Sequence, residues 1–381
     1  MPLKCLLGET PIFGFNYSIE EWERLKSENR KHKLLFMPCC HVRAIPKTSK
    51  LGTNFFAHAK AEGCETAAES AEHLLAKATI AEAAKLAGWT VDTEVRGVTV
   101  EGDTWVADVL AMKGQSKVAI EVQWSKQAQV ETKRRQAKYA ESGVRGLWLM
   151  RHPNLLVEQE TPTFRLRFDE SARTFFVQIP SPRYHPEFVG NHNKNEPSYW
   201  QQEIGLSDFV VGALNGALKF APVIGRRLPA SISTAPISCW RCKKTTRIVH
   251  GVTFEACKVL PEHPNIYAAL YDFESLDSGA TLLAALFPSH LLRKHEIGAI
   301  KDRYSRTMGG SYLSNGCVHC DALQGRFYDH DSWYEAVPTY TVELELSKQL
   351  ASHLVECESE AGHDIFRWWF DGLTVKGVRG G

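Results

Sequence analysis

Two strand-like runs joined by four residues are the feature that most constrains how this chain folds. The runs are TWVADVLAM (104–112) and KVAIEVQWS (117–125), and KGQS connects them. Apolar and β-branched runs with so short a connection predict an antiparallel hairpin. Each run carries one acid, Asp108 in the first and Glu121 in the second. We therefore expect two carboxylates at the same edge of one hairpin.

Segments on either side of the hairpin extend this pattern. Thr66 and Glu69 match a capping box, which predicts a helix that begins at Thr66 and ends at Gly88. The other segments predict a strand, a helix capped by Ser125 and a last strand, at 89–95, 125–142 and 146–151. The expected fold is α/β, with the order helix, three strands, helix, strand around a mixed sheet. This order, αβββαβ, is the minimal core of the PD-(D/E)xK nuclease fold.

The length of 381 residues predicts two or three domains. We expect an N-terminal region with a candidate zinc-binding cysteine cluster, a nuclease-like core, an α+β linker region, and a C-terminal α+β zinc-ribbon-like domain with an insertion. Their expected ranges are 1–65, 66–155, 156–236 and 237–381. Within the linker region, FRLRF and TFFVQI predict a pair of strands, and residues 206–220 predict a helix.

The balance of charge limits how the chain can contact nucleic acid. With 45 basic and 44 acidic residues the formal net charge is +1, so bulk electrostatics would not coat DNA. Contact would have to come from local basic clusters, which are also typical of ordinary solvated surfaces. No apolar run reaches the roughly 18 residues of a membrane span, and the N-terminus does not resemble a signal peptide. We therefore expect a cytoplasmic protein with no membrane partner.

The two hairpin acids suit a divalent metal. Hydrolysis of a phosphodiester uses a metal that polarises the phosphoryl oxygen and generates hydroxide near neutral pH. Mg²⁺ usually takes one or two carboxylates besides water and substrate oxygens. Asp108, Glu121 and the backbone carbonyl of Val122 meet that need, for Mg²⁺ or Mn²⁺. Gln123 stands where such motifs usually carry lysine, and we expect it to orient the attacking water. The alternative is an ordinary surface carboxylate on an edge strand.

The helix before the hairpin offers further polar groups. Glu69, His73 and Lys77 are spaced four residues apart and so share one helix face. Glu69 is a candidate third metal ligand, and His73 and Lys77 are candidate contacts to phosphate or water. Lys77 is also a candidate substitute for the missing strand lysine. The alternatives are that the capping box accounts for Glu69 and that the other two are solvated.

The helix after the hairpin carries a cluster of basic and aromatic residues. We expect these residues to contact DNA phosphates, and Arg135 and Tyr139, four residues apart, also to brace the metal site. The set is Lys133, Arg134, Arg135, Lys138 and Tyr139.

Five ordered motifs over about 115 residues resemble the competence protein CoiA-like family. They are FFAHAKAEGC, ESAEHLLAK, WVADVL, AIEVQWS and GVRGLWLM. The resemblance implies a PD-(D/E)xK fold and DNA processing in bacteria, notably during transformation. It also implies an active-site set, with Ser125 as a motif position of unknown role: Glu69, His73, Asp108, Glu121 and Gln123.

Two CxxC pairs predict a structural zinc site. They are Cys239 with Cys242 and Cys317 with Cys320, a set of four thiolates typical of zinc. The separation, residues 243–316, is longer than the roughly 15 to 20 residues of a zinc ribbon, which an inserted subdomain would explain. His319 could replace one thiolate. The alternative is two buried cysteine pairs that never meet.

A second zinc site is predicted near the N-terminus. Four residues there are candidate ligands, with His41 in reserve: Cys39, Cys40, His58 and Cys64. Adjacent cysteines rarely bind the same ion because their side chains diverge, so a hydrophobic cluster of thiols is the alternative.

The leading hypothesis is a Mg²⁺- or Mn²⁺-dependent deoxyribonuclease, either an endonuclease or an exonuclease. We expect it to act on DNA in DNA processing, competence or phage defence, with other proteins of such a system as candidate partners. A non-cutting DNA-binding or scaffold protein is the alternative, because Gln123 replaces the usual lysine. A redox or metal sensor would also use CxxC pairs, but the thioredoxin-like context is missing around them.

Overall fold

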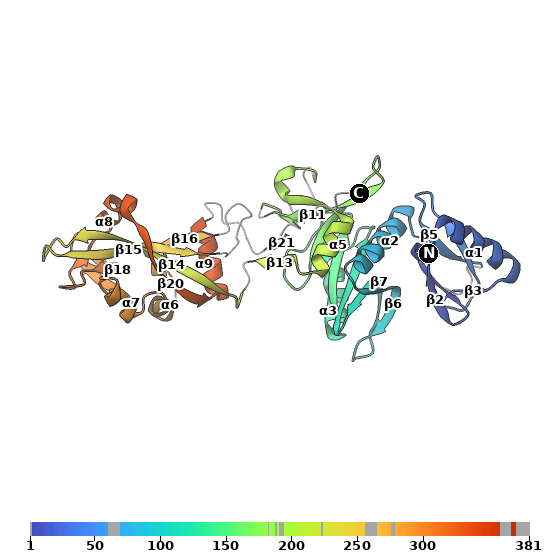
Figure 1. The fold of residues 1–381 in the computed structure, drawn as a ribbon, viewed down its shortest axis with the longest axis horizontal. Helices are drawn as coiled ribbons and strands as arrows, with labels where there is room; N and C mark the ends of the chain where they lie inside the picture. Colours follow the sequence, from blue (N-terminus) through green and yellow to red (C-terminus); the bar gives the residue numbers. More distant parts are fainter. Residues whose placement is uncertain are drawn as a thin grey trace, which may run out of the picture. The chain divides into compact units, whose positions relative to one another are not determined.

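The computed structural model divides the chain into two compact units (Figure 1). Unit 1 comprises Met1–Lys219 and Arg367–Gly381, and unit 2 comprises Phe220–Phe366. The residues described are 2–59, 69–181, 183–186, 189, 194–221, 224–255, 265–275, 279–358 and 367–370. The division after Lys219 falls inside the expected linker region: residues 156–219 belong to unit 1 with the expected nuclease-like region, and residues 220–236 belong to unit 2.

The N-terminal part of unit 1 is a small α+β layer. Helix α1 (Ile19–His32) begins at Ser18, whose side chain forms a capping box with Glu21. Around it lie a three-stranded sheet and a hairpin, formed by β1 (Lys4–Leu7), β2 (Thr10–Phe13), β3 (Leu35–Phe36), β4 (Ala44–Thr48) and β5 (Asn54–His58). Trp22, Met37 and Phe56 are buried together in its core.

A seven-stranded mixed sheet forms the centre of unit 1. Its order is β12-β11-β10-β9-β8-β7-β6. The strands are β6 (Thr90–Val98), β7 (Thr104–Lys113), β8 (Ser116–Gln123), β9 (Arg145–Met150), β10 (Thr163–Asp169), β11 (Thr174–Pro180) and β12 (Trp200–Gly205). Strands β8, β9 and β10 are parallel, and the other neighbours pair antiparallel. The predicted hairpin is confirmed as β7–β8, and the predicted pair FRLRF and TFFVQI as β10–β11.

Two helices cover opposite faces of this sheet (Figure 1). Ile120 packs in one cluster with Ile80 of α2 (Ala71–Leu86). Its neighbour Ala119 packs in another cluster with Tyr139 of α3 (Gln129–Glu141). Because successive strand residues point to opposite faces, α2 and α3 lie on opposite sides of β8. Helix α5 (Leu206–Leu214) packs beside α2, and the order α2–β6–β7–β8–α3–β9 is the predicted one.

Helix starts differ from the sequence prediction. Helix α2 begins after Ser70, whose side chain accepts from the His73 N–H, and Thr66 lies outside the described residues. Helix α3 begins after Ala128, so Ser125 is not its cap. The predicted linker adds β10, β11 and β12 to the central sheet, because its apolar strands have a free parallel edge at β9 to pair with. The predicted helix 206–220 ends at Leu214 and is followed by β13 (Leu218–Ala221), which pairs with β21 (Arg367–Phe370).

Unit 2 has its own sheet and its own core. The four-stranded sheet has the order β16-β15-β14-β20, formed by β14 (Arg227–Ser238), β15 (Thr245–Phe254), β16 (Ile266–Ala269) and β20 (Val337–Glu345). A second sheet, β17 (Ile300–Ser305), β18 (Gly310–Gly316) and β19 (Leu323–Gln324), forms a ribbon. The helices are α6 (Gly279–Leu286), α7 (Ser289–Lys294), α8 (Arg326–Asp331) and α9 (Lys348–Glu358). Among all described helices, none is long and apolar enough to cross a membrane.

Candidate functional site

Three acids lie in a row across neighbouring strands of the central sheet. The β7–β8 ladder ends at the pair Val109–Ile120, so the next positions, Asp108 and Glu121, stand opposite each other where the strands separate. On the other side of β7, the register places Glu94 of β6 opposite Asp108. The hairpin thus brings the two predicted acids to one level of the sheet, and β6 adds a third acid at that level.

Asp108 is held by the helix before the hairpin and by the next strand. Its Oδ2 accepts from the Val122 N–H at 2.9 Å, and His73 Nε2 lies 3.5 Å from the same oxygen. Lys77 Nζ lies 3.9 Å from Oδ1. Burial by itself would raise the pKa of Asp108, but the imidazole, the ammonium and the backbone N–H together lower it to about 2. Asp108 is therefore a carboxylate at neutral pH.

Lys77 is the internal cation of this site. Its side chain is 0% exposed, and its ammonium contacts Glu94 Oε1 at 2.6 Å and Glu69 Oε1 at 3.1 Å, besides Asp108. Burial alone would lower the pKa of Lys77, but the three carboxylates raise it above its usual range. Of the predicted face, His73 and Lys77 thus contact Asp108, whereas Glu69 precedes the helix and pairs with Lys77.

Glu94 belongs to the site and was missed by the sequence analysis. Its backbone has a φ of 49°, in the left-handed region that is uncommon for a residue other than glycine. Its Oε1 accepts from the Leu3 N–H at 3.1 Å. Its Oε2 is buried and, among the described atoms, has no hydrogen-bond partner. The only signal in the sequence was an acid in the strand before Asp108, which many exposed strands also carry.

Glu121 faces the other helix. It is 2% exposed, and its Oε2 accepts from Arg135 Nη2 at 2.5 Å. The Tyr139 hydroxyl donates to its Oε1, and the Arg135 guanidinium lies 4.8 Å from the centre of the Trp148 ring. Burial and the charge of Asp108 raise the pKa of Glu121 to about 7, although its two hydrogen-bond partners act in the opposite direction. The two central acids therefore differ widely in proton affinity.

Gln123 and Ser125 form one unit at the end of β8. Gln123 Nε2 donates to the Ser125 hydroxyl at 2.9 Å and to the Ser125 carbonyl at 3.1 Å. This contact assigns the amide nitrogen to Ser125 and leaves the amide oxygen directed elsewhere. Ser125, whose role was unknown in the motif, thus orients Gln123 and does not cap α3.

The basic residues of α3 divide into two groups. Arg135 and Tyr139 point inward and hold Glu121, so they belong to the site. Lys133 and Arg134 form exposed ion pairs with Glu158 and Glu131, of a kind that contributes little to stability. The Lys138 side chain is 15% exposed; it pairs with Asp103 and donates to the Thr104 carbonyl.

The oxygen donors of the site can suit a divalent cation only after side-chain rotation. Within the described part of the chain, no three carboxylate or imidazole atoms of this site lie within 4.8 Å of one another. Lys77 and Arg135 hold the carboxylates toward opposite helices. Two buried atoms, Glu94 Oε2 and His73 Nε2, are without a hydrogen-bond partner among the described residues. Buried polar atoms of this kind are consistent with a site that takes up a cation, because an unmet buried acceptor is unfavourable.

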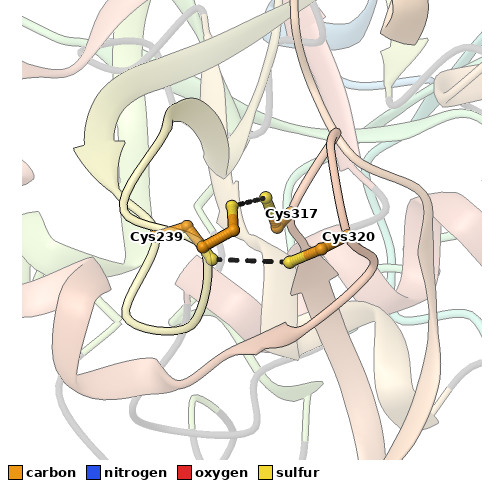
Figure 2. Close-up of side chains that lie close together, drawn as sticks. Cys239, Cys317 and Cys320 are labelled. Carbon is orange, nitrogen blue, oxygen red and sulfur yellow. Dashed lines mark hydrogen bonds between the residues drawn. The ribbon is translucent and has the colours of Figure 1, made fainter.

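The two CxxC pairs meet in unit 2, as Figure 2 shows for Cys239, Cys317 and Cys320. The sulfur of Cys239 lies 3.8 Å from that of Cys320, and the sulfur of Cys242 lies 3.7 Å from that of Cys317. A tetrahedral zinc with metal–sulfur distances of about 2.3 Å requires sulfur separations of about 3.8 Å. A disulfide would bring the sulfurs to about 2.05 Å. The four thiols therefore fit a structural zinc ion.

The two CxxC turns share one backbone conformation. Cys239 N–H donates to the Lys244 carbonyl and Lys243 N–H donates to the Cys239 carbonyl, both at 2.9 Å. Cys317, Asp321 and Ala322 repeat these bonds at the same distances. Lys243 and Asp321 both have positive φ, 63° and 54°. We call these turns the first knuckle (239–244) and the second knuckle (317–322).

The N-terminal cluster has the same kind of turn. Met37 N–H donates to Val42 O at 2.8 Å, and His41 N–H donates to Met37 O at 2.9 Å, with His41 at a φ of 54°. Met37 thus replaces the first cysteine of the turn, and its buried side chain packs in the core. The ligand atoms brought together are those of Cys39, Cys40 and His58. Cys64, the fourth predicted ligand, lies outside the described residues.

Comparison with protein families agrees with the motifs read from the sequence. Residues 69–194 match the family model described as competence protein CoiA, nuclease-like domain. The matched segment contains α2, α3 and strands β6 to β11, and with them the row of acids. This match confirms the family resemblance for that segment and indicates a function related to nucleic-acid hydrolysis. No curated protein matches this sequence.

Proposed function

We propose that this chain is a divalent-metal-dependent deoxyribonuclease, on the premise that residues 69–194 match the nuclease-like domain of competence protein CoiA. The observation that carries the proposal is a pair of carboxylates, Asp108 and Glu121, at the point where two strands separate; Glu121 is 2% exposed and the Asp108 side chain is 20% exposed. A buried acid requires a cation or hydrogen-bond partner, and two together favour a shared cation. DNA is the proposed partner, in DNA processing, competence or phage defence.

The proposed metal ligands are Asp108, Glu121 and the Val122 carbonyl, with Glu69 as a further acid. Bound Mg²⁺ or Mn²⁺ would polarise the scissile phosphoryl group and lower the pKa of a bound water. The chain's own residues then position this chemistry. Arg135 and Tyr139 hold Glu121, and the Val122 N–H holds Asp108. These contacts hold both acids in the metal-free chain, and the carboxylates would rotate from these partners to reach a shared cation.

Gln123 and Lys77 together replace the lysine that such motifs usually carry on the strand: Gln123 orients water, and Lys77 supplies the positive charge. Ser125 holds the amide nitrogen of Gln123, so its amide oxygen can accept a hydrogen bond from the attacking water and orient it. Lys77 supplies the positive charge from inside the sheet, where it keeps Asp108 ionised. The Lys77 ammonium is fully buried and therefore acts through the carboxylates and not on the phosphate.

Amide substitution of the two acids is expected to abolish cleavage. Asp108→Asn and Glu121→Gln each keep the side-chain volume and remove one charged ligand. We expect each to lower the rate with Mn²⁺ by about 10²- to 10³-fold, the effect of removing one preorganised electrostatic group. The measurement is the cleavage rate on labelled single-stranded, double-stranded and branched DNA.

Glu131→Gln is the matched control, because Glu131 is a surface carboxylate on α3 paired with Arg134. It should cut at the wild-type rate. If Asp108→Asn and Glu121→Gln are folded by circular dichroism and cut as fast as this control, the two acids do not form the active site and the proposal is wrong.

A non-cutting DNA-binding protein is the second candidate function. It is favoured by the contacts of the cations, since both Lys77 and Arg135 are engaged with the acids, and by glutamine at position 123. This alternative predicts that the chain binds the DNA panel with Mn²⁺ present and leaves every substrate intact.

A further inference from the structure

The first knuckle carries a large aromatic side chain on the surface. Trp240 lies between the two cysteines and is 51% exposed. Its indole N–H donates to the Leu323 carbonyl of β19 at 2.7 Å. One edge of the ring is therefore fixed to the ribbon, while half of the side chain is open to solvent. A tryptophan held in this way loses little conformational freedom when a flat ligand stacks on it.

Basic residues follow this tryptophan in the sequence of the turn. Arg241, Lys243 and Lys244 are all exposed and lie within four residues of it. In the second knuckle, Val318, His319, Asp321 and Ala322 occupy the positions of the tryptophan and its three basic neighbours.

Metal binding does not account for these residues. The two knuckles have the same backbone hydrogen bonds and the same positive φ at the equivalent residue, yet their side chains between and after the cysteines differ completely. Asp321, the acid of the second knuckle, is neutralised by Lys301 and Arg303. The turn thus requires neither an aromatic ring nor three positive charges, and the first knuckle presents both on its surface.

We propose that the first knuckle binds single-stranded nucleic acid, with an unpaired base stacked on Trp240 and backbone phosphates at Arg241, Lys243 and Lys244. Stacking of bases on aromatic side chains beside a basic groove is the physical basis of single-strand binding. A duplex keeps its base faces inside the helix, so the ring selects unpaired bases. Lysine is depleted at protein–protein interfaces, which disfavours a protein partner. Unit 2 would thus select single strands over duplexes, and this binding does not depend on whether residues 69–194 cut DNA.

Trp240→Ala in the full chain is expected to weaken binding of a labelled 20-nucleotide single strand about tenfold or more. Trp240→Phe keeps a ring to stack on and should retain most of the affinity. Lys243→Ala with Lys244→Ala should reduce the slope of log affinity against log salt by about 1.4, since each released phosphate contact contributes about 0.7. Fluorescence anisotropy without added Mg²⁺ or Mn²⁺ measures binding apart from cleavage.

Trp333→Ala is the matched control. Trp333 lies in the same unit and is also 51% exposed, but its sequence neighbours include Asp331 and Glu335. It should bind as the wild type does, and the zinc content of all variants should be unchanged. The inference is overturned if Trp240→Ala binds the single strand as tightly as the control, if a duplex of the same length binds equally well, or if polyglutamate competes as effectively as the single strand.

Discussion

Removal of zinc is expected to unfold the β17–β18–β19 ribbon of unit 2 and to leave unit 1 folded. Structural zinc sites contribute about 10 kcal/mol or more of binding free energy, and this energy is available to the folded state alone. Besides the metal ligands, the second knuckle is held by short contacts: β18 and β19 pair at Asn315–Gln324 and Gly316–Leu323, and the Val318 N–H donates to the Thr246 hydroxyl at 3.0 Å. Without the metal, four partly buried thiols would remain crowded together with no bond between them.

The measurement is hydrogen–deuterium exchange by mass spectrometry. It is made on the wild-type chain treated with a chelator and on a double variant that combines Cys239→Ser and Cys317→Ser. Peptides that cover 239–244 and 310–324 should exchange at nearly the unprotected rate, while peptides of β7 and β8 keep their protection. Elemental analysis should show that the double variant has one zinc fewer per chain than the wild type. Cys5→Ser, a change at a buried thiol outside both clusters, should keep the full zinc content. A wild-type chain that is folded and protected throughout without zinc would contradict the structural role.

Lys77→Met is expected to destabilise unit 1 by about 3 to 5 kcal/mol, the usual result of removing one partner of a buried ion pair. Methionine fills the volume of lysine but leaves Glu69, Glu94 and Asp108 without their common cation. Three carboxylates would then lie close together, and Glu94 already has one oxygen that is buried and lacks a hydrogen bond among the described atoms. The expected readout is exchange in α2 and β7 that is faster by roughly 10²- to 10³-fold.

Lys50→Met is the control for this substitution. The exposed side chain of Lys50, which lies outside α2, forms an ion pair with Glu72 in the first turn of α2. The distance from Lys50 Nζ to Glu72 Oε1 is 3.0 Å. Exposed pairs contribute about 0 to 1 kcal/mol, so exchange in α2 should change little. Equal effects of the two substitutions would mean that the buried ammonium is not the internal cation that we infer.

The predictions that came true rest on local signals. The hairpin of 104–125 followed from two apolar runs with a four-residue connection, and the two acids were expected at the same edge of it. Asp108 and Glu121 are therefore opposite each other for a reason already present in the sequence. The meeting of the CxxC pairs was also predicted, because four thiolates in this pattern have few other uses in a folded chain.

The predictions that differed from the structure depended on distant contacts. Thr66 and Ser70 are both good helix caps, and sequence preference could not choose between them. Residues 156–236 looked like a linker because nothing local reveals that β9 offers a free parallel edge. Glu94 was missed because its partners, Lys77 and the Leu3 N–H, come from a helix and from the N-terminus. Arg135 was expected on DNA, and only the packing of α3 on the sheet turned it toward Glu121.

The sequence by itself therefore determined the hairpin, the two acids at one level of it, and the cysteine set for zinc. The hairpin and its acids depend on residues that are close in the chain. The zinc set depends on four cysteines in a pattern whose usual role is to bind zinc. Tertiary structure alone decided which cation serves which acid: Lys77 lies with Glu94 and Asp108, and Arg135 lies with Glu121. Helices α2 and α3 pack on opposite faces of the sheet, and the direction of a buried side chain is set by what packs against it.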